Sequence, residues 1–288
     1  MKKEPSVNTL DSFRLDGARA LVTGASRGIG QAIALALAEA GADVAIAARS
    51  TEALRGTAEQ IARTGRDAFP LAGDFSVPEA AAEVVTRAAE TLGGLDTVVH
   101  CAGVLPTLPD GSPILAPLQD TEQEDWNTVL TVNLNASAAL CRQAHRYLVG
   151  STRAAVVLLS STSGLIGSPT MEAYAASKAA QVSLARSLGV GWARQGIRVN
   201  ALCAGWTRTD LTAPFEDAVP VSEWLMSHVP MGRWAEPEEV ARAALFLTSP
   251  ASSYLTGTAL ALDGGVSVPD GGLAGIPKPP PPPSSAAA

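Results

Sequence analysis

Seven short apolar runs alternate with amphipathic stretches, and this alternation constrains the fold of the chain more than any other feature. The runs are nearly continuous in Val, Ile, Leu and Ala, which predicts strands covered on both faces. They span residues 18–23, 43–48, 68–72, 96–100, 155–160, 198–202 and 258–262. The helix-like stretches are 29–40, 51–63, 78–92, 121–148, 171–194 and 237–247. Strands that alternate with helices pair in parallel. We therefore predict an α/β fold with one doubly wound domain, in which a seven-stranded parallel sheet carries helices on both faces.

The two ends of the chain differ in composition from the middle. Residues 1–12 are polar, and we predict a flexible extension there. Nothing divides residues 13–267, so we predict a single domain. Residues 268–288 include five consecutive prolines, a composition that cannot bury a core. A disordered or extended tail of neutral function and a ligand for a proline-recognition domain are the two interpretations, and the composition favours the first.

Charge and cysteine content exclude several classes of function. The net charge of -7 argues against nucleic acid or an anionic membrane as the main partner. Cys101, Cys141 and Cys203 are far apart in sequence, so neither a disulfide framework nor a zinc site is expected. We predict no metal site and no membrane span. Reduced thiols and the lack of a secretory signal at the start of the chain favour the cytoplasm.

A glycine-rich loop follows the first predicted strand and opens the first predicted helix. Gly24 permits a tight turn, Gly28 lets the backbone approach a pyrophosphate, and Gly30 lets the helix pack closely on the sheet. The helix N-terminus offers N–H groups and a positive dipole end to phosphates. An ordinary strand-to-helix turn is the alternative, but the position of the loop favours a dinucleotide. The candidate contacts are Gly24, Ser26, Arg27, Gly28, Ile29 and Gly30.

The end of the second predicted strand indicates which dinucleotide binds. NAD-binding proteins carry an acidic residue near this point, where it holds the ribose hydroxyls. Here Ala48 stands in that place, followed by Arg49 and Ser50. Arg49 and Arg27 of the glycine loop provide two guanidinium groups, which suit a 2′-phosphate. NADP(H) is therefore favoured over NAD(H); the alternative is that both arginines are solvated surface residues.

Tyr174 and Lys178 are four residues apart in a helix-like stretch, which places them on one face and one turn apart. Tyrosine is a poor acid–base group at neutral pH because its pKa is about 10. A nearby lysine cation stabilises the phenolate and is expected to lower that pKa. Ser161 ends the preceding strand, so a short loop can bring its hydroxyl and that of Tyr174 to one carbonyl oxygen. Ser160 and Ser163 compete for this role, and the spacing favours Ser161.

These features, in this order, resemble the short-chain dehydrogenase/reductase family in its typical single-domain form, including 3-oxoacyl-carrier-protein reductases. The resemblance runs from about residue 13 to residue 265. It rests on the glycine loop, Asp74, Ala102-Gly103, Asn133, Ser161, the Tyr174 and Lys178 pair, residues 198–201, Gly205, and segments 232–241 and 262–265. It implies a Rossmann-type fold and an NADP(H)-dependent oxidoreductase that interconverts a ketone or aldehyde and an alcohol. Family members are usually homotetramers or homodimers.

The resemblance also implies a role for each matching residue. Tyr174 would donate or accept the substrate proton, and Ser161 would bind the substrate oxygen. Lys178 would bind the nicotinamide ribose and tune Tyr174. Asn133 would hold a water that links Lys178 to solvent, with a purely structural role as the alternative. The further cofactor contacts would be Asp74, Phe75, Cys101, Ala102, Gly103, Gly205, Thr207 and Thr209, together with Tyr174 and Lys178.

Two departures from the family pattern concern the strand ends. The family commonly has Asn-Asn-Ala-Gly where this chain has His100-Cys101-Ala102-Gly103. The second Asn helps to tie the central strands together, so another group must do so here. Cys101 is expected to be a small buried filler rather than a nucleophile. Ala204 replaces the usual Pro before Gly205, and we expect a looser start to the substrate loop.

The substrate pocket is expected between the loop after His100, with Pro106, Pro109, Pro113 and Pro117, and the segment 206–233. An apolar stripe in that segment predicts a mobile lid, with core or subunit interface as an equal alternative. Since no arginine cluster marks an acidic substrate, we expect a fairly apolar ketone, aldehyde or secondary alcohol. An NAD(P)-linked alcohol, polyol or sugar dehydrogenase is a second hypothesis. A non-enzymatic nucleotide-binding sensor is a third, and the complete proton-transfer set argues against it.

Overall fold

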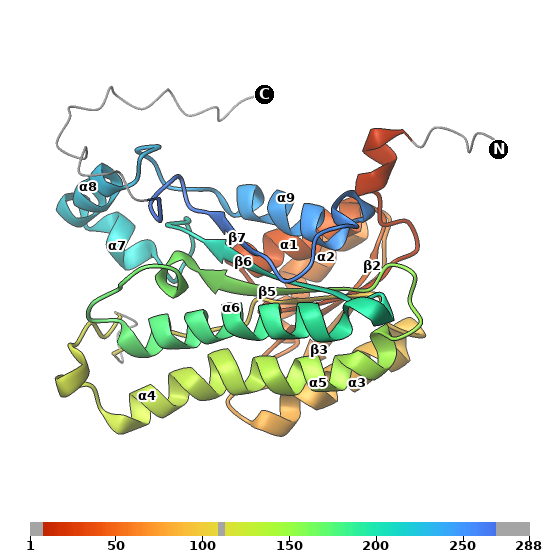
Figure 1. The fold of residues 1–288 in the computed structure, drawn as a ribbon, viewed down its shortest axis with the longest axis horizontal. Helices are drawn as coiled ribbons and strands as arrows, with labels where there is room; N and C mark the ends of the chain where they lie inside the picture. Colours follow the sequence, from red (N-terminus) through yellow and green to blue (C-terminus); the bar gives the residue numbers. More distant parts are fainter. Residues whose placement is uncertain (1–7, 109–112, 269–288) are drawn as a thin grey trace.

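A computed structural model describes residues 8–108 and 113–268. Its centre is a parallel sheet of seven strands in the order β3-β2-β1-β4-β5-β6-β7 (Figure 1). The strands are β1 Arg19–Thr23, β2 Asp43–Ala48, β3 Ala68–Ala72, β4 Thr97–His100, β5 Ala155–Ser161, β6 Arg198–Ala204 and β7 Ala259–Leu262. Each predicted apolar run forms one strand, and the predicted fold class, a doubly wound domain of the Rossmann type, is confirmed.

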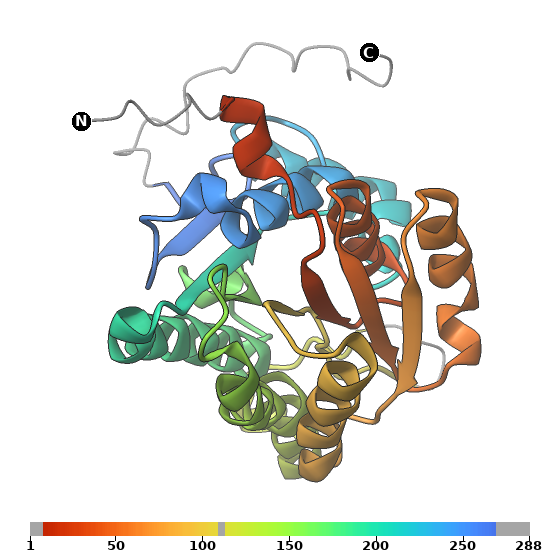
Figure 2. The same cartoon turned by 90° about the vertical axis from the view of Figure 1, so that its right-hand side faces the viewer.

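Two layers of helices enclose the sheet (Figure 2). Successive side chains of a strand point to opposite faces, and this divides the core. In β2, Val44 and Ile46 pack on one face, while Ala45 and Ala47 pack on the other. The first face is covered by α1 Gly28–Glu39 and α9 Pro237–Thr248, with α2 Arg55–Arg63 packed on α1. The second is covered by α3 Pro78–Leu92, α5 Ala136–Leu148 and α6 Glu172–Trp192. Both faces of the strand are therefore buried, as its continuous apolar sequence predicts.

A π turn divides the stretch 121–148, which the sequence predicts as one helix. α4 Gln123–Leu130 and α5 are joined by Thr131–Asn135, and the N–H of Ala136 donates to the carbonyl of Thr131, five residues back. The wider turn directs Asn133 toward α6, where its amide donates to the hydroxyl of Ser177 at 3.1 Å. The uninterrupted helix is thus a wrong prediction, because a contact between two helices determines the local backbone.

Two short helices form within the segment 206–233. They are α7 Ala213–Asp217 and α8 Val219–His228, and each has a proline in its first turn. Both lie at the left of Figure 1, beyond the ends of β5 and β6. At this end of the molecule, the carboxyl ends of the strands lead into the loops that carry the predicted site.

The N-terminal part of the described chain is helical from residue 9. Thr9–Phe13 form a 3-10 helix, and the ring of Phe13 lies 6.4 Å from that of Phe246 on α9. The predicted tail from residue 269 onward, with its prolines, lies outside the described residues, as does Pro109 in the loop after β4. In the part of the chain that the structure describes, no helix is both long and apolar enough to cross a membrane.

Candidate active site

The predicted site residues gather at the carboxyl ends of the strands. β1 and β4 are neighbours in the sheet but not in sequence, so the connections diverge between them and a crevice opens at this edge. The loops that leave the strands carry residues 24–30 after β1, 49–50 after β2, 74–75 after β3, 101–103 after β4, and 205–209 after β6. Ser161 ends β5, Asn133 comes from the π turn, and Tyr174 and Lys178 come from α6. Strand topology thus brings these distant parts of the sequence to one edge.

The glycine positions of this loop have no room for a side chain. Gly24 and Gly28 have φ angles of 65° and 56°, in the left-handed region that residues with a Cβ rarely adopt. A Cβ on Gly30 would lie 2.2 Å from the carbonyl oxygen of Gly24. A Cβ on Gly24 would meet the backbone nitrogen of Ala102 at 2.8 Å. The loop therefore packs α1 closely against the ends of β1 and β4.

The N-terminus of α1 is suited to an anion. Arg27, which precedes the first turn, makes no side-chain cap hydrogen bond, and the first turn contains no acidic residue. The first N–H groups of the helix therefore lack a side-chain cap, and the dipole leaves this end positive. Ser26 and Ile29 are partly exposed on the same loop. These residues fit the pyrophosphate of a dinucleotide.

The two arginines predicted to face a 2′-phosphate have different surroundings. Arg49 is exposed directly after β2, and within the described ranges no carboxylate forms an ion pair with it. Arg27 donates to Asp210 at 2.8 Å, and both of these side chains are exposed. The neighbouring Ser50 accepts from the N–H of Ala53 at 3.3 Å. Asp210 therefore competes with a phosphate for the charge of Arg27, whereas Arg49 has no ion-pair partner in the described ranges.

Asp74 and Phe75 follow β3, which lies next to β2 in the sheet. Oδ1 of Asp74 accepts from the N–H of Ser76 at 2.9 Å. This hydrogen bond lowers the pKa of Asp74, and the charge of Arg49 acts in the same direction. Asp74 is therefore an ionised acceptor, which suits an amino group such as that of adenine. Phe75 is buried, and its ring meets that of His100 edge-on, with 5.8 Å between the centroids.

Thr23 ties the central strands together in place of the missing asparagine. Its hydroxyl oxygen accepts from the N–H groups of Cys101 at 3.2 Å and Ala102 at 3.3 Å. Its one proton is then left for Nδ1 of His100, 2.8 Å away. Burial lowers the pKa of His100 to about 3, so this imidazole is neutral. The expected tie between β1 and β4 exists, and a threonine and a histidine make it.

Cys101 has the properties of a filler. Burial raises the pKa of its thiol to about 12, so the nucleophilic thiolate is not formed at neutral pH. Gly103, two residues on, is also constrained by packing, because a Cβ there would lie 3.3 Å from Oδ1 of Asn133 and 3.4 Å from Nζ of Lys178. The loop after β4 therefore forms one wall of the catalytic cluster.

Ser161, Tyr174 and Lys178 form one cluster where β5 meets α6. Ser161 is close enough to the Tyr174 hydroxyl to affect its pKa, and the ammonium of Lys178 lies 5.5 Å from the centre of the Tyr174 ring. Ser160 is buried and donates to the carbonyl of Lys178 at 2.8 Å, so its hydroxyl has a structural partner. The N–H of Ser163 donates to the Ser161 oxygen at 3.1 Å. This geometry favours Ser161 as the serine that faces a substrate.

The protonation of the pair differs from the prediction. Burial raises the pKa of Tyr174, and the neighbouring Ser161 hydroxyl opposes that rise. The expectation that Lys178 lowers this pKa is wrong for the free protein, because burial of the phenol outweighs the opposing effect. Burial also lowers the pKa of Lys178 to about 8. Tyr174 is therefore fully protonated at neutral pH, in the form that can donate a proton.

Asn133 is completely buried and its hydrogen bonds are taken up by the protein. Its side chain accepts from the N–H of Val104 at 2.8 Å and donates to the carbonyl of the same residue at 3.0 Å. Its backbone carbonyl accepts from the hydroxyl of Ser137 at 2.6 Å and from Nε2 of Gln181 at 2.8 Å. Gln181, which was not predicted from the sequence, links this carbonyl to Nζ of Lys178.

The start of the segment 206–233 is held firmly. The N–H of Gly205 donates to the carbonyl of Leu262 on β7 at 2.9 Å, and a Cβ on Gly205 would lie 2.6 Å from Cα of Asp263. Thr207 is buried, and the methyl group of Thr209 would lie 3.1 Å from a Cβ on Gly28. The loosening expected from Ala204 is therefore not found, and the segment contacts the glycine loop.

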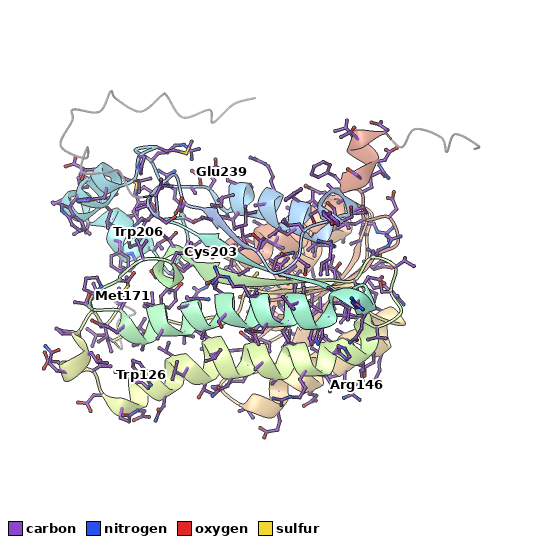
Figure 3. The ribbon with its side chains drawn as sticks, in the orientation of Figure 1. Trp126, Arg146, Met171, Cys203, Trp206 and Glu239 are labelled. Atoms are coloured by element: carbon purple, nitrogen blue, oxygen red, sulfur yellow. The ribbon has the colours of Figure 1, made fainter. Side chains whose placement is uncertain are left out.

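An aromatic cluster follows at the base of α7 and α8. The ring of Trp206 lies 5.6 Å from that of Phe215 and 5.6 Å from that of Trp234, both edge-on. Nε1 of Trp234 donates to the hydroxyl of Ser222 on α8 at 2.9 Å. Figure 3 shows Trp206 at the same end of the molecule as Met171, which precedes α6. An apolar surface thus stands at the catalytic end of the sheet; its mobility stays a prediction.

Among residues 8–108 and 113–268, no group of three or more His, Cys, Asp or Glu side chains could hold a metal ion. The chemistry available at this edge is that of a hydroxyl pair and an amine beside a dinucleotide-type loop.

Known proteins resemble this chain over nearly its whole length. A family model described as Enoyl-(Acyl carrier protein) reductase matches residues 24–267. The gluconate 5-dehydrogenase of Gluconobacter oxydans (strain 621H) is 32% identical over 258 residues, which cover 90% of this chain and 98% of that protein. The chain belongs to the short-chain dehydrogenase/reductase family. The predicted resemblance is thereby confirmed, and the protein is an oxidoreductase of that family.

Two further members of the short-chain dehydrogenase/reductase family show the range of relatives. The 3-oxoacyl-acyl-carrier-protein reductase of Chlamydia trachomatis is 35% identical over 249 residues, covering 86% of this chain and 96% of that protein. The crystal structure of a gluconate 5-dehydrogenase from Burkholderia cenocepacia J2315, in complex with NADP and tartrate, has a TM-score of 0.83 and 33% identity. That match covers 90% of this chain and 99% of the crystallised one. The relatives thus include both sugar-acid dehydrogenases and a carbonyl reductase.

Proposed function

We propose that the protein is an NADP(H)-dependent oxidoreductase that interconverts a ketone or aldehyde and an alcohol, with Tyr174 as the proton-transfer group. One observation carries this proposal. Ser161 and Tyr174, with Lys178 beside them, lie at the same sheet edge as a glycine loop that fits a pyrophosphate. A nucleotide sensor has no use for such a pair, so the cluster favours an enzyme.

Each residue of the cluster has a distinct task in this mechanism. Ser161 and Tyr174 both direct hydroxyl groups at the substrate oxygen, which fixes the carbonyl carbon in place. Tyr174 donates its proton to that oxygen during reduction and accepts it during oxidation. NADP(H), when bound, supplies or accepts the hydride. Lys178 holds positive charge next to Tyr174 while it is an ammonium, and this charge favours the phenolate that forms after proton donation.

The preference for NADP(H) is supported by the second strand and by a relative. Ala48 occupies the position that holds an acidic residue in NAD-binding proteins, and Arg49 is exposed beside it without an ion pair in the described ranges. The Burkholderia cenocepacia relative was crystallised with NADP. The remaining proposed cofactor contacts are the residues of the glycine loop, Ser50, Asp74, Phe75, Cys101, Ala102, Gly103, Gly205, Thr207 and Thr209, with Tyr174 and Lys178.

We place the substrate among neutral carbonyl compounds and alcohols. The segment 206–233 contains two cationic side chains, Arg208 and Arg233, and both are already bonded to carboxylates. The aromatic cluster around Trp206 offers an apolar surface instead. The names of relatives such as the gluconate 5-dehydrogenases support the second candidate, a polyol or sugar-acid dehydrogenase. A panel that contains both substrate classes separates the two candidates.

We also propose a cytoplasmic homotetramer or homodimer. Cys101, Cys141 and Cys203 are all free thiols, which suits a reducing compartment. β7 lies at the edge of the sheet, so one side of this strand has no partner strand within the described chain and is available to a second copy. The acidic net charge argues against nucleic acid as a partner.

The test combines nucleotide binding with turnover. NADPH and NADH binding are measured by fluorescence, and carbonyl and alcohol panels are then run with the preferred nucleotide, for the wild type and Tyr174→Phe. We expect tighter binding of NADPH, turnover of at least one neutral carbonyl compound, and near-complete loss of turnover in the variant with unchanged NADPH binding. Tight binding without turnover across both panels would favour the sensor, and failure to bind either nucleotide would overturn the proposal.

A further inference from the structure

Gln181 is a buried polar residue, and both polar atoms of its side chain have hydrogen-bond partners. It lies on α6, three residues after Lys178, and its exposed fraction is 0%. Its Oε1 accepts from Nζ of Lys178 at 3.1 Å. Its Nε2 donates to the carbonyl of Asn133 at 2.8 Å and to the hydroxyl of Ser137 at 2.9 Å. The side-chain amide thus joins the catalytic lysine to the π turn.

The surroundings of Lys178 leave one N–H for the reaction. An ammonium has three N–H donors. Nζ donates one to the carbonyl of Leu159 at 2.8 Å and a second to Gln181. A Cβ on Gly103 would lie 3.4 Å from Nζ, so the nitrogen is packed against the loop after β4. The direction of the third N–H is fixed by the other two bonds.

The groups that face Lys178 are weak acids or neutral. They are the thiols of Cys101 and Cys203, the imidazole of His100 and the phenol of Tyr174. In the part of the chain that the structure describes, no carboxylate forms an ion pair with Lys178. Because a buried cation without a counter-charge depends on neutral acceptors, the Gln181 oxygen contributes strongly to holding it.

We propose that Gln181 is a positioning residue, which joins the Lys178 ammonium to the carbonyl of Asn133 and directs its remaining N–H toward the reacting groups. This inference rests on the proposed function, since it assigns Lys178 to the reaction. An amide donates and accepts hydrogen bonds but, unlike water, does not pass a proton along at neutral pH.

Lysine content allows a test that needs no substrate. The chain has four lysines, and Lys178 is the one that lies between residues 4 and 277. The full-length protein labelled with 13C at lysine Cε therefore gives an NMR titration in which Lys178→Met identifies the Lys178 signal. We expect a midpoint of about 8 for the wild type.

Two variants of opposite effect are compared with the wild type. Gln181→Met keeps the size of the side chain but removes the acceptor, so the ammonium is less stable and the pKa of Lys178 falls. Gln181→Glu places a carboxylate beside the ammonium, so the pKa of Lys178 rises. We expect shifts of about one pH unit in each direction. Gln123→Met, at an exposed position on α4, is the matched control and should leave the titration unchanged.

Kinetics provide the second readout. If the proposed reaction is observed, Gln181→Met should lower kcat about tenfold with a small change in the KM for NADPH, since positioning and not affinity is lost. The pH at which kcat declines should move in the direction of the NMR shift for each variant.

An unchanged Lys178 titration and pH profile in folded Gln181 variants would overturn this inference. Absence of turnover in the wild type would instead overturn the proposed function, while the NMR titration would still decide the role of Gln181. Should Gln181→Met fail to fold, the upward shift expected for Gln181→Glu decides alone.

Discussion

At the scale of single residues, the availability of a charge matters as much as its position. Arg49 and Arg27 lie at the same end of the cleft, yet Arg27 is bonded to Asp210 and Arg49 is exposed without an ion pair in the described ranges. A phosphate that approaches Arg27 meets a carboxylate already bound to it, and repulsion between the two anions offsets part of the new bond. Discrimination between the two nucleotides should therefore depend mainly on Arg49.

Reversing the charge at this position should reverse the preference. In Arg49→Asp, the introduced carboxylate repels a 2′-phosphate and can accept from a free 2′-hydroxyl. A charge-assisted hydrogen bond contributes about 1.5–3 kcal/mol, so the ratio of kcat/KM for NADPH to that for NADH should fall by more than about tenfold. Steady-state kinetics with both nucleotides measure the ratio. Arg63→Asp, on the exposed face of α2, controls for net charge. An unchanged ratio in Arg49→Asp would contradict the assignment of Arg49.

Residues whose role follows from local spacing could be predicted from the sequence. Tyr174 and Lys178 share a helix face because they are four apart, and Ser161 reaches them because it ends a strand. The role of Gln181 and the ion pair of Arg27 with Asp210 could not be predicted this way. The partner of Gln181 on the π turn is 48 positions away and that of Arg27 is 183 positions away. Such contacts depend on how elements pack, and no local pattern encodes them.

At the scale of elements, capping residues at the start of a helix contribute to stability, and their pattern can be recognised in the local sequence. α9 begins after Glu236, whose N–H donates to a carboxylate oxygen of Glu239 at 2.9 Å. Arg233 holds the same carboxylate through two hydrogen bonds of 2.8 Å. Mainly because of Arg233, the pKa of Glu239 is lowered to about 2. The ionised side chain thus binds both the helix N-terminus and the loop before it.

A change at Glu239 should have an effect on stability that depends on pH. Because the pKa of Glu239 is lower in the folded state than in the unfolded state, its contribution is present above about 4.5 and is lost as pH falls toward about 2. Glu239→Gln should lower the free energy of unfolding at pH 7 by about 1 kcal/mol, allowing for partial exposure. Urea denaturation at several pH values measures this. Glu238→Gln, exposed in the same turn, should have a smaller effect. A deficit that stays constant down to pH 2 would exclude the ionised carboxylate as its cause.

Strands were easier to predict than helix interruptions. A run of buried apolar residues has one common explanation in an alternating α/β chain, so all seven strands were located. The π turn at Thr131–Asn135 contains no Gly or Pro, the residues that would indicate a helix interruption in the sequence. It arises because Asn133 bonds to Val104, Ser177 and Gln181, which belong to other elements. An element boundary that depends on tertiary contacts cannot be predicted from the residues of that element alone.

At the scale of the whole molecule, one ion pair joins the cofactor loop to the segment before α7. Arg27 follows β1 and Asp210 follows β6, and their side chains meet at 2.8 Å. Thr209 approaches Gly28 at the same place. A ligand that attracts Arg27 must therefore weaken a contact between two loops, and the energies of the two events are linked.

Asp210→Asn should strengthen NADPH binding. The variant frees Arg27 from an exposed ion pair, and such pairs contribute about 0–1 kcal/mol. The Kd for NADPH should thus decrease by at most about fivefold, while that for NADH changes little. Fluorescence titration with both nucleotides measures the change. Glu223→Gln on α8 also removes one negative charge and serves as the control. Weaker NADPH binding in Asp210→Asn would mean that the pair supports the site and does not compete for it.

The order of the strands has a consequence for how the chain reaches this fold. β2 pairs with one side of β1 and β3 pairs with β2; β4 then pairs with the other side of β1, and β5, β6 and β7 follow outward. Each strand is therefore added to an existing edge of the sheet, and none has to enter between two strands that are already paired. A chain that emerges from the ribosome from its N-terminus can assemble the sheet in the order of synthesis, with no strand pair to break. The site is assembled late in this sequence, because Tyr174 and Lys178 arrive only after five of the seven strands have been made.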